Sequence, residues 1–352
     1  MLCMILVSCT GQKTGKENDN NDKIAIEVGE IKFPPQDVLQ LKSYYLSSSV
    51  HVDSIDYLIG YNYRLHSLDC MNLKSKSVTQ IVLPGDGPDA IVRLSGIYAQ
   101  SLDSVWISDE SERAFLIDSV GTIKRMIDLK KYLEDQEQLL INTNYAMFTS
   151  HLFYNASRHS LMFLVKHTPS NTFIVKEAFI DEVGKMATYQ LSSSKVVPDM
   201  SKGYAYINFP NVNFVGENIV YNYPVESSIY MLDIRTNERK YILADSHYTS
   251  NIIEKCTTSG DYATLEKHWL ENSHFYDIMY LPKYKIYARL HADKVDFDEK
   301  KGMEKLINER DLYLMLFDEN MEKIGETKLS NCRYSPFTSW NATYGGIALF
   351  VD

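Results

Sequence analysis

Four acidic residues lie close together in the sequence and could in principle bind a cation. They are Asp293, Asp296, Asp298 and Glu299. A calcium loop needs regularly spaced oxygen ligands and a glycine at its sharp turn, and Gly302 is misplaced for that turn. The helix dipole also favours acidic residues at the start of a helix. We therefore interpret this cluster as the solvated start of a helix, and we predict no metal site and no cofactor.

The motifs of common enzyme classes are missing from the sequence. It contains no Gly-x-Ser-x-Gly elbow and no His-Glu-x-x-His motif, and its nine histidines are scattered. The glycine-rich stretch Gly85–Pro88 is a turn, because Pro88 lacks the N–H group that a phosphate would need. We therefore assign no catalytic residue. An enzyme would need two carboxylates, or a histidine and a carboxylate, brought together by the fold.

Aromatic residues are the remaining candidates for binding, since the chain contains 25 Tyr and 14 Phe. We expect Tyr57, Trp106, Tyr221 and Tyr287 to lie on innermost strands, where they would offer an aromatic surface to a sugar or a peptide. The alternative is that such rings pack between sheets, which is their commoner role. These four residues are the predicted binding residues.

Cys9 is the one residue predicted to be covalently modified. An apolar run, Leu2–Val7, leads into Leu6-Val7-Ser8-Cys9, which resembles the lipobox of bacterial lipoproteins. Residues 1–9 are therefore predicted to be a lipoprotein signal, with Cys9 as the lipidated residue. No basic residue precedes the apolar run, which is about half the usual length. We expect the natural start to lie further upstream.

Residues 10–22 contain no strongly apolar side chain and are predicted to be a flexible tether. Acyl chains on Cys9 would then hold the protein at a bilayer of the bacterial cell envelope, on a membrane face that the sequence leaves open. The formal net charge of -10 argues against a nucleic-acid partner, because phosphates attract clusters of Lys and Arg. Residues 23–352 are predicted to form a single domain.

A repeated pattern in this domain predicts its fold. An apolar run ending in aspartate precedes a polar turn and a second strand-like run at five places: Asp69, Asp118, Asp181, Asp233 and Asp318. An aspartate at such a position can accept backbone N–H bonds two residues on and fix a hairpin. Repeats of about 40 to 50 residues with four short strands each are typical of propeller blades.

The two chain ends are expected to complete the ring. Strand-like runs at Ile24–Val28 and Glu30–Phe33 would join others around Ser335–Trp340 and Gly346–Val351. Sharing a blade in this way removes exposed sheet edges. The predicted fold is an all-β, six-bladed β-propeller closed by N- and C-terminal strands.

Short helical insertions are predicted at three places. Asp261–Leu270 has an aspartate cap and one apolar face, and Asp298–Arg310 has a similar apolar side. A third helical stretch is expected at Leu129–Leu140.

Several segments resemble a known family. They are the lipobox, Leu83–Pro88, Trp106–Asp109, Ile117–Gly121 and the run Phe275–Tyr280 followed by Lys285–Arg289. The chain is similar to the exported TolB-like six-bladed propellers of Bacteroidetes, and within these to a lipoprotein family known as domain of unknown function four-two-two-one. The resemblance covers roughly residues 24 to 352 and implies the fold and an exported location, but no catalytic residues.

The function expected from these observations is that of an envelope lipoprotein whose propeller binds a ligand or partner. The membrane would be contacted through the lipid anchor, and the ligand would be a glycan, a peptide or an envelope protein. The alternative is a carbohydrate-active or other hydrolase or lyase with an axial site. The apolar and aromatic character of the expected inner residues favours binding.

Overall fold

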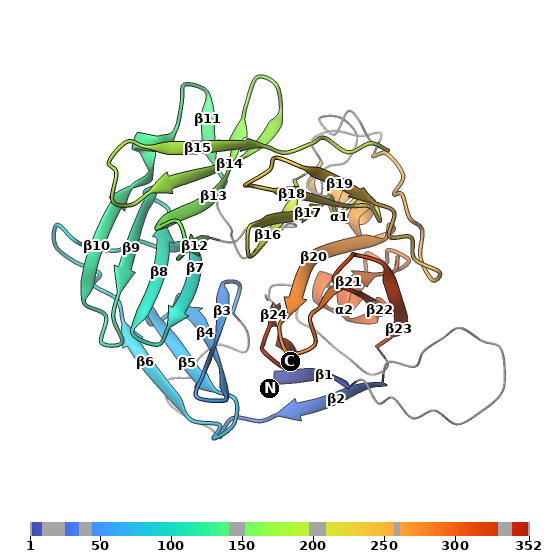
Figure 1. Ribbon diagram of the computed structural model, residues 1–352. Helices are drawn as coiled ribbons and strands as arrows, with labels where there is room; N and C mark the ends of the chain where they lie inside the picture. Colours follow the sequence, from blue (N-terminus) through green and yellow to red (C-terminus); the bar gives the residue numbers. More distant parts are fainter. Residues whose placement is uncertain are drawn as a thin grey trace.

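The computed structural model describes residues 2–8, 25–34, 44–140, 152–196, 209–256, 261–329 and 340–350. Nearly all regular structure in these ranges is β-strand. The strands pair antiparallel in sheets that surround a common centre (Figure 1). The sequence-based prediction of an all-β propeller with a few short helices is therefore confirmed.

Five sheets are blades built from consecutive strands, and the first strand in each pairs only with the next one outward. The first two blades contain β3 (Ser47–Val52), β4 (Ile55–Asn62), β5 (Ser67–Asn72) and β6 (Val78–Val82), then β7 (Leu94–Ser101), β8 (Ser104–Asp109), β9 (Arg113–Ile117) and β10 (Ile123–Asp128). The third contains β12 (Phe153–Asn155), β13 (Ser160–His167), β14 (Thr172–Phe179) and β15 (Met186–Gln190), with β11 (Glu137–Leu139) on the same edge of β13 as β12. The fourth and fifth contain β16 (Asn211–Val215), β17 (Asn218–Asn222), β18 (Ile229–Asp233) and β19 (Arg239–Ile242), then β20 (His274–Leu281), β21 (Ile286–Ala292), β22 (Leu312–Phe317) and β23 (Lys323–Lys328).

A further sheet, here called the closing sheet, is made from both ends of the chain. Its strands are β1 (Leu2–Ser8), β2 (Ala25–Ile31), β24 (Trp340–Ala342) and β25 (Gly346–Phe350), in the order β2-β1-β25-β24. β2 overlaps the two strand-like runs expected at residues 24–28 and 30–33. It shares a sheet with the C-terminal strand β25, and β1 lies between the two. Figure 1 shows this sheet between the first and fifth blades.

The number of blades differs from the prediction. Consecutive strands form five blades rather than six. The remaining unit is the closing sheet, which joins strands from opposite ends of the sequence. Counting hairpins along the chain cannot establish such a unit, because its strands are contributed by two distant segments.

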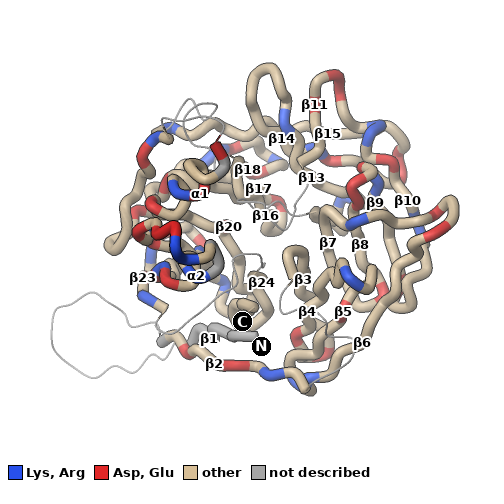
Figure 2. The backbone as a smooth tube through the Cα atoms, turned by 180° about the vertical axis from the view of Figure 1, so that it is seen from behind, with Lys and Arg blue, Asp and Glu red and all other residues tan. Residues whose placement is uncertain are grey.

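The first expected helical insertion is confirmed, and the other two are shorter than expected. Helix α1 (Tyr262–Leu270) is capped by Asp261, whose side chain accepts a bond from the N–H of Ala263, as predicted. Helix α2 (Met303–Glu309) occupies only part of the second expected range, and the third range contains a single 3-10 turn, Leu129–Tyr132. Neither α1 nor α2 could cross a membrane. Both helices lie on one face of the ring beside the fourth and fifth blades (Figure 2).

The apolar core lies between neighbouring blades. Ile59 and Leu68 of the first blade pack in one cluster with Ile97 and Phe115 of the second. In the closing sheet, successive residues of β25 face opposite neighbours. Ile347 and Leu349 join the cluster of the fourth and fifth blades, whereas Ala348 and Phe350 join the cluster of the first blade. Alternation along a strand therefore lets one sheet fill two interfaces.

Three of the five predicted hairpin aspartates fix turns as expected. Asp118, Asp233 and Asp318 each accept two backbone N–H bonds from the turn that follows. The bond from Lys124 and those backbone N–H groups hold the pKa of Asp118 at about 2. Gly121 completes this turn at a φ of 85°, which glycine adopts without the steric penalty that other residues incur.

The other two aspartates have different roles. Asp69 is buried inside β5 and accepts bonds from Tyr44, Asn62 and Gln80. The turn after β5 is fixed instead by Asn72. Asp181 lies in its turn, but its side chain pairs with Arg125 of the neighbouring blade.

Candidate functional site

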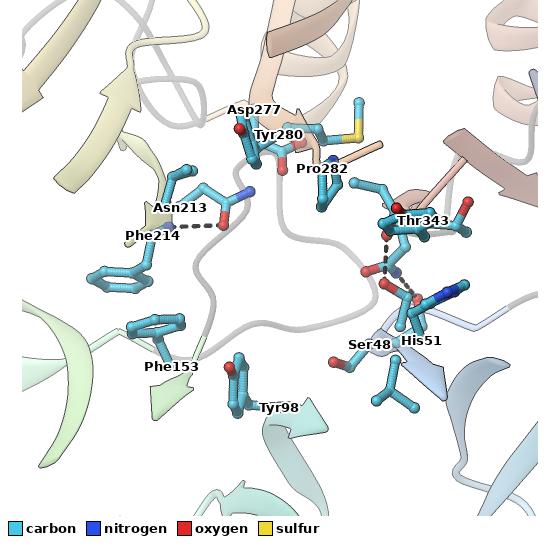
Figure 3. Close-up of a pocket in the computed structure, with 18 of the residues that line it drawn as sticks. Ser48, His51, Tyr98, Phe153, Asn213, Phe214, Asp277, Tyr280, Pro282 and Thr343 are labelled. Carbon is cyan, nitrogen blue, oxygen red and sulfur yellow. Dashed lines mark hydrogen bonds between the residues drawn. The ribbon is translucent and has the colours of Figure 1, made fainter. Parts of the chain in front are cut away.

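A cavity of about 390 Å³ lies at the centre of the ring, and we call it the axial cavity. It is lined by β3, β7, β12, β16, β20 and β24, or by residues directly beside them, so every blade and the closing sheet contribute. Figure 3 shows these side chains arranged around the open space. Its volume falls at the lower end of the range for small-molecule sites. A second, larger and more polar hollow of about 850 Å³ lies beside α1.

One wall of the axial cavity is aromatic. Phe153 of β12 stacks on Phe214 of β16, with 5.0 Å between ring centroids and 14° between ring planes. Tyr98 of β7 meets Phe153 edge-on at 5.1 Å. These contacts join the second, third and fourth blades, so the position of each ring is fixed by its neighbours.

The facing wall combines an aromatic ring with a carboxylate. The indole Nε1 of Trp340, on β24, donates a hydrogen bond to Oδ1 of Asp277 on β20. Tyr276 packs edge-on against the indole at 4.4 Å. Tyr280, also on β20, adds a partly exposed ring to the lining.

The polar side chains of the lining mostly donate to other protein groups. The hydroxyl of Ser49 donates to the carbonyl of Ala342, and the amide of Asn341 donates to the hydroxyl of Ser47. On β16, Asn213 donates to the carbonyl of Ile278 at 2.9 Å. Thr343 donates to the carbonyl of Gly346 at 3.2 Å. These bonds tie inner strands together and leave acceptor lone pairs on several side chains.

His51 lies at the edge of the cavity. Its Nδ1 is 2.7 Å from Oδ1 of Asp56, and its ring stacks on Tyr344 at 4.1 Å. The backbone N–H of Tyr344 donates to the same carboxylate oxygen. The three residues thus connect the first blade to the hairpin between β24 and β25.

Charge is almost excluded from the inner strands. Among all residues of β3, β7, β12, β16, β20 and β24, Asp277 is the single Asp, Glu, Lys or Arg. The charged residues lie mainly on outer strands, turns and helices (Figure 2). Within the described ranges, the cavity lining therefore contains one carboxylate and no lysine or arginine.

The four predicted binding residues do not line the axial cavity. Tyr57, Trp106, Tyr221 and Tyr287 lie on β4, β8, β17 and β21, the second strand of their blades. The expectation that they lie on innermost strands is therefore wrong. Trp106 and Tyr221 are buried in apolar clusters, and Tyr221 stacks on Tyr230 of the adjacent strand. The prediction began each blade one strand too far out, in part because first strands such as β3 and β16 are rich in polar residues.

The other chemical candidates from the sequence are not part of this cavity. Cys9 and residues 10–22 lie outside the described residues. Asp293 and Asp296 lie beside the second hollow, and Asp298 precedes α2. No group of three or more potential metal ligands occurs within the described ranges.

Buried charged groups elsewhere form contacts inside the protein. Arg289 is fully buried between the fourth and fifth blades, where it donates to the carbonyls of Ser227 and Ala244, and burial lowers its pKa to about 9. Burial alone would raise the pKa of Glu326, but hydrogen bonds from His291 and Ser246 outweigh this effect and hold it at about 2. The side chains of His291 and Glu326 are at most 3% exposed, so these groups hold blades together and are out of reach of a ligand.

The ring of antiparallel blades around a lined central cavity defines the class of this protein as a β-propeller. No curated protein matches the sequence. The family model described as domain of unknown function (DUF4221) matches residues 17–328, and the chain belongs to this family. A member of the same family from Bacteroides vulgatus has a crystal structure with a TM-score of 0.66 at 15% identity, covering 84% of each chain. An exported protein from Bacteroides fragilis has a TM-score of 0.49 at 13% identity, covering 85% of this chain and 74% of its own.

Proposed function

We propose that this protein is a binding protein that holds a small ligand in the axial cavity. The observation that supports this proposal is the convergence of the inner strands on one cavity with aromatic walls. Rings such as Tyr98 and Phe153 can cover the apolar face of a ligand, while hydroxyl and amide groups orient it. The rings are held by contacts between blades, so the cavity is largely preformed and little ordering opposes binding.

The alternative of a hydrolase or lyase has less support. Acid–base catalysis would require a second group opposite Asp277 within the cavity. The histidine of the lining, His51, is engaged with Asp56, and Ser49 donates its proton to a backbone carbonyl rather than to a histidine. This arrangement favours binding over bond cleavage.

Filling the cavity tests the proposed binding. A screen of saccharides, peptides and small organic cations should contain a ligand that raises the melting temperature of the wild-type protein. Saturation at about 100 times the dissociation constant would stabilise the fold by about 2.7 kcal/mol. Ser49→Trp places a large side chain into the cavity and should abolish this shift. Ser75→Trp, on the exposed turn between β5 and β6, should preserve it.

Two results would overturn the proposed binding. One is the absence of a thermal shift with every compound class in the wild-type protein. The other is a shift that is equally large in Ser49→Trp, because the ligand would then bind elsewhere.

We also propose that the closing sheet acts as the sixth blade, so that the ring is six-bladed and TolB-like. Its inner strand β24 lies between β20 and β3, and β25 packs against both neighbouring blades. The hairpin of β24 and β25 is held to the first blade by Ser47, Ser49 and Asp56. Deletion of β24 and β25 tests this role.

We further propose that Cys9 is lipidated and anchors the protein in the bacterial cell envelope. Cleavage before Cys9 would remove β1, which pairs with β2 along its length and with β25 over Leu2–Leu6. In the mature protein, β2 would then have to move by one strand spacing, about 5 Å, to pair with β25. Intact-mass measurement on membrane fractions should find a chain that begins with acylated Cys9. An unmodified Cys9 still preceded by Ser8 would refute the anchor.

A further inference from the structure

We infer that the ligand of the axial cavity is a neutral saccharide of one or two rings. This inference rests on the proposed function of the same cavity and narrows its ligand to one chemical class. Three observations support it: partly exposed aromatic rings, polar side chains that can still both donate and accept hydrogen bonds, and a lining whose one carboxylate is buried.

The aromatic rings of the lining can cover the apolar face of a sugar ring. Tyr98, Phe153, Tyr280 and Trp340 are each partly exposed, and they come from four different strands, β7, β12, β20 and β24. Figure 3 shows the rings of Tyr98 and Phe153 beside the open space. A pyranose presents C–H groups on its two faces, and an aromatic ring can pack against such an apolar surface. The cavity of about 390 Å³ is at the lower end of the range for small-molecule sites, which suits one or two sugar rings.

Two asparagine side chains of the lining keep both kinds of hydrogen-bonding group. Asn213 donates one amide hydrogen to the carbonyl of Ile278, and its Oδ1 accepts the backbone N–H of Phe214. Asn341 donates one amide hydrogen to the hydroxyl of Ser47. An amide has two hydrogens and two acceptor lone pairs. Within the part of the chain that the structure describes, each of these partly exposed side chains therefore retains one hydrogen and at least one lone pair for a ligand.

Two hydroxyl groups of the lining add to this mixed set. Ser48 Oγ accepts the backbone N–H of Ala99 at 3.0 Å, so its own hydrogen can still be donated. The hydroxyl of Tyr98 has no hydrogen-bond partner among the described residues and can either donate or accept. A sugar hydroxyl also both donates and accepts, so it can use both kinds of group. An ammonium group can only donate and a carboxylate can only accept, so each would use half of the lining.

The distribution of charge favours a ligand that is itself neutral. Asp277, the one carboxylate of the described lining, is 1% exposed and accepts the hydrogen bond from Trp340, so it offers almost no surface to a ligand. No lysine or arginine of the described ranges lines the cavity, and His51 at its edge is engaged with Asp56. A charged sugar would therefore lose its hydration without meeting an accessible opposite charge, whereas a neutral sugar does not incur that cost.

Calorimetric titration of the whole protein tests the ligand class. The neutral probes are glucose, galactose, mannose and N-acetylglucosamine, with cellobiose and lactose as two-ring probes. The charged counterparts are the uronates of the three hexoses and glucosamine. Cyclohexanol represents an apolar ring with one hydroxyl, and acetyl-trialanine amide represents a neutral peptide. At least one neutral saccharide should bind, about tenfold or more tightly than its charged counterpart, cyclohexanol and the peptide.

Single substitutions locate saccharide binding in the cavity. Tyr98→Phe removes one hydroxyl and keeps the ring, and it should weaken binding about threefold to tenfold. Tyr63→Phe removes the same group from an exposed ring outside the cavity and should leave binding unchanged. Asn213→Leu removes an amide of the lining and should weaken binding about tenfold or more, whereas Asn320→Leu, on the exposed turn after β22, should not. If Asn213→Leu folds poorly, the two tyrosine variants still test the inference.

The outcomes separate this inference from the proposed function. Suppose that cyclohexanol, the peptide or a charged sugar binds as tightly as every neutral saccharide, and that Ser49→Trp abolishes this binding. The saccharide would then be overturned, and the cavity would remain a binding site. Saccharide binding that is unchanged in the folded Tyr98→Phe and Asn213→Leu variants would also overturn the inference. Absence of binding by every probe and by every compound of the thermal screen would overturn both.

Discussion

Deletion of residues 340–352 is expected to abolish cooperative folding of the propeller at 37 °C. The deletion removes β24 and β25, and with them Ile347, Leu349 and Phe350, which are at most 4% exposed. Burial of each such side chain contributes about 2 kcal/mol, so the three together contribute about 6 kcal/mol. A typical domain is stable by only about 5–15 kcal/mol, so the loss is comparable with the whole stability. Guanidinium denaturation followed by circular dichroism measures it.

Single substitutions separate the packing of β25 from a general effect of shortening the chain. Leu349→Ala should cost about 2–5 kcal/mol, because it leaves a cavity at a fully packed interface. Val82→Ala, at a site that is 64% exposed on β6, should change stability by less than about 0.5 kcal/mol. A truncated protein that melts cooperatively at the wild-type temperature would refute the role of the closing sheet as a blade.

Replacement of Lys176 by methionine is expected to destabilise the third blade by about 3–5 kcal/mol. The Lys176 side chain is fully buried on β14, and its Nζ lies 3.0 Å from Oε1 of Glu137 and 3.1 Å from Oε1 of Glu134. Glu137 is itself 3% exposed. Removal of the lysine leaves that carboxylate buried without its cation. This uncompensated charge destabilises the folded state relative to the unfolded state. Urea denaturation at neutral pH gives the free energy of unfolding.

A double variant and a surface control make the Lys176 prediction specific. Lys176→Met combined with Glu137→Leu should recover most of the loss, because an apolar pair removes the uncompensated charge. Lys185→Met breaks an exposed pair with Glu182 on the next turn and should cost less than about 1 kcal/mol. A single Lys176→Met variant as stable as Lys185→Met would show that the buried pair contributes nothing.

Local patterns were sufficient to predict the second, third and fourth strands of the blades. Runs such as Leu161–Val165 on β13 and Ala114–Ile117 on β9 are continuously apolar, because both faces of a blade pack against neighbouring blades. The turns after β9, β18 and β22 were predictable because Asp118, Asp233 and Asp318 satisfy backbone N–H groups within the same short segment. The cap of α1 by Asp261 is local for the same reason. At Asp69 the pattern was the same, but long-range bonds from Tyr44 and Gln80 gave the residue another role.

The residues that line the axial cavity could not be predicted, because they are brought together only when the ring closes. The first strands of the blades include stretches rich in polar residues, such as Ser47-Ser48-Ser49 and Asn211–Val215. Their inner faces line an open space rather than a core. One signal was present in the sequence: these stretches contain almost no charged residue, even though they are polar. This scarcity of charge indicates a cavity lining only when the first strand of each blade is already known.

The sequence by itself determined that the chain forms antiparallel hairpins in a propeller, since apolar runs and turn chemistry act over a few residues. Tertiary structure alone decided which strand of each blade faces the axis, the strand order β2-β1-β25-β24 in the sheet that the two chain ends share, and the contact of Asp277 with Trp340. Those contacts join residues up to about 350 positions apart in the sequence. Their geometry depends on how many blades close the ring, which no local interaction specifies.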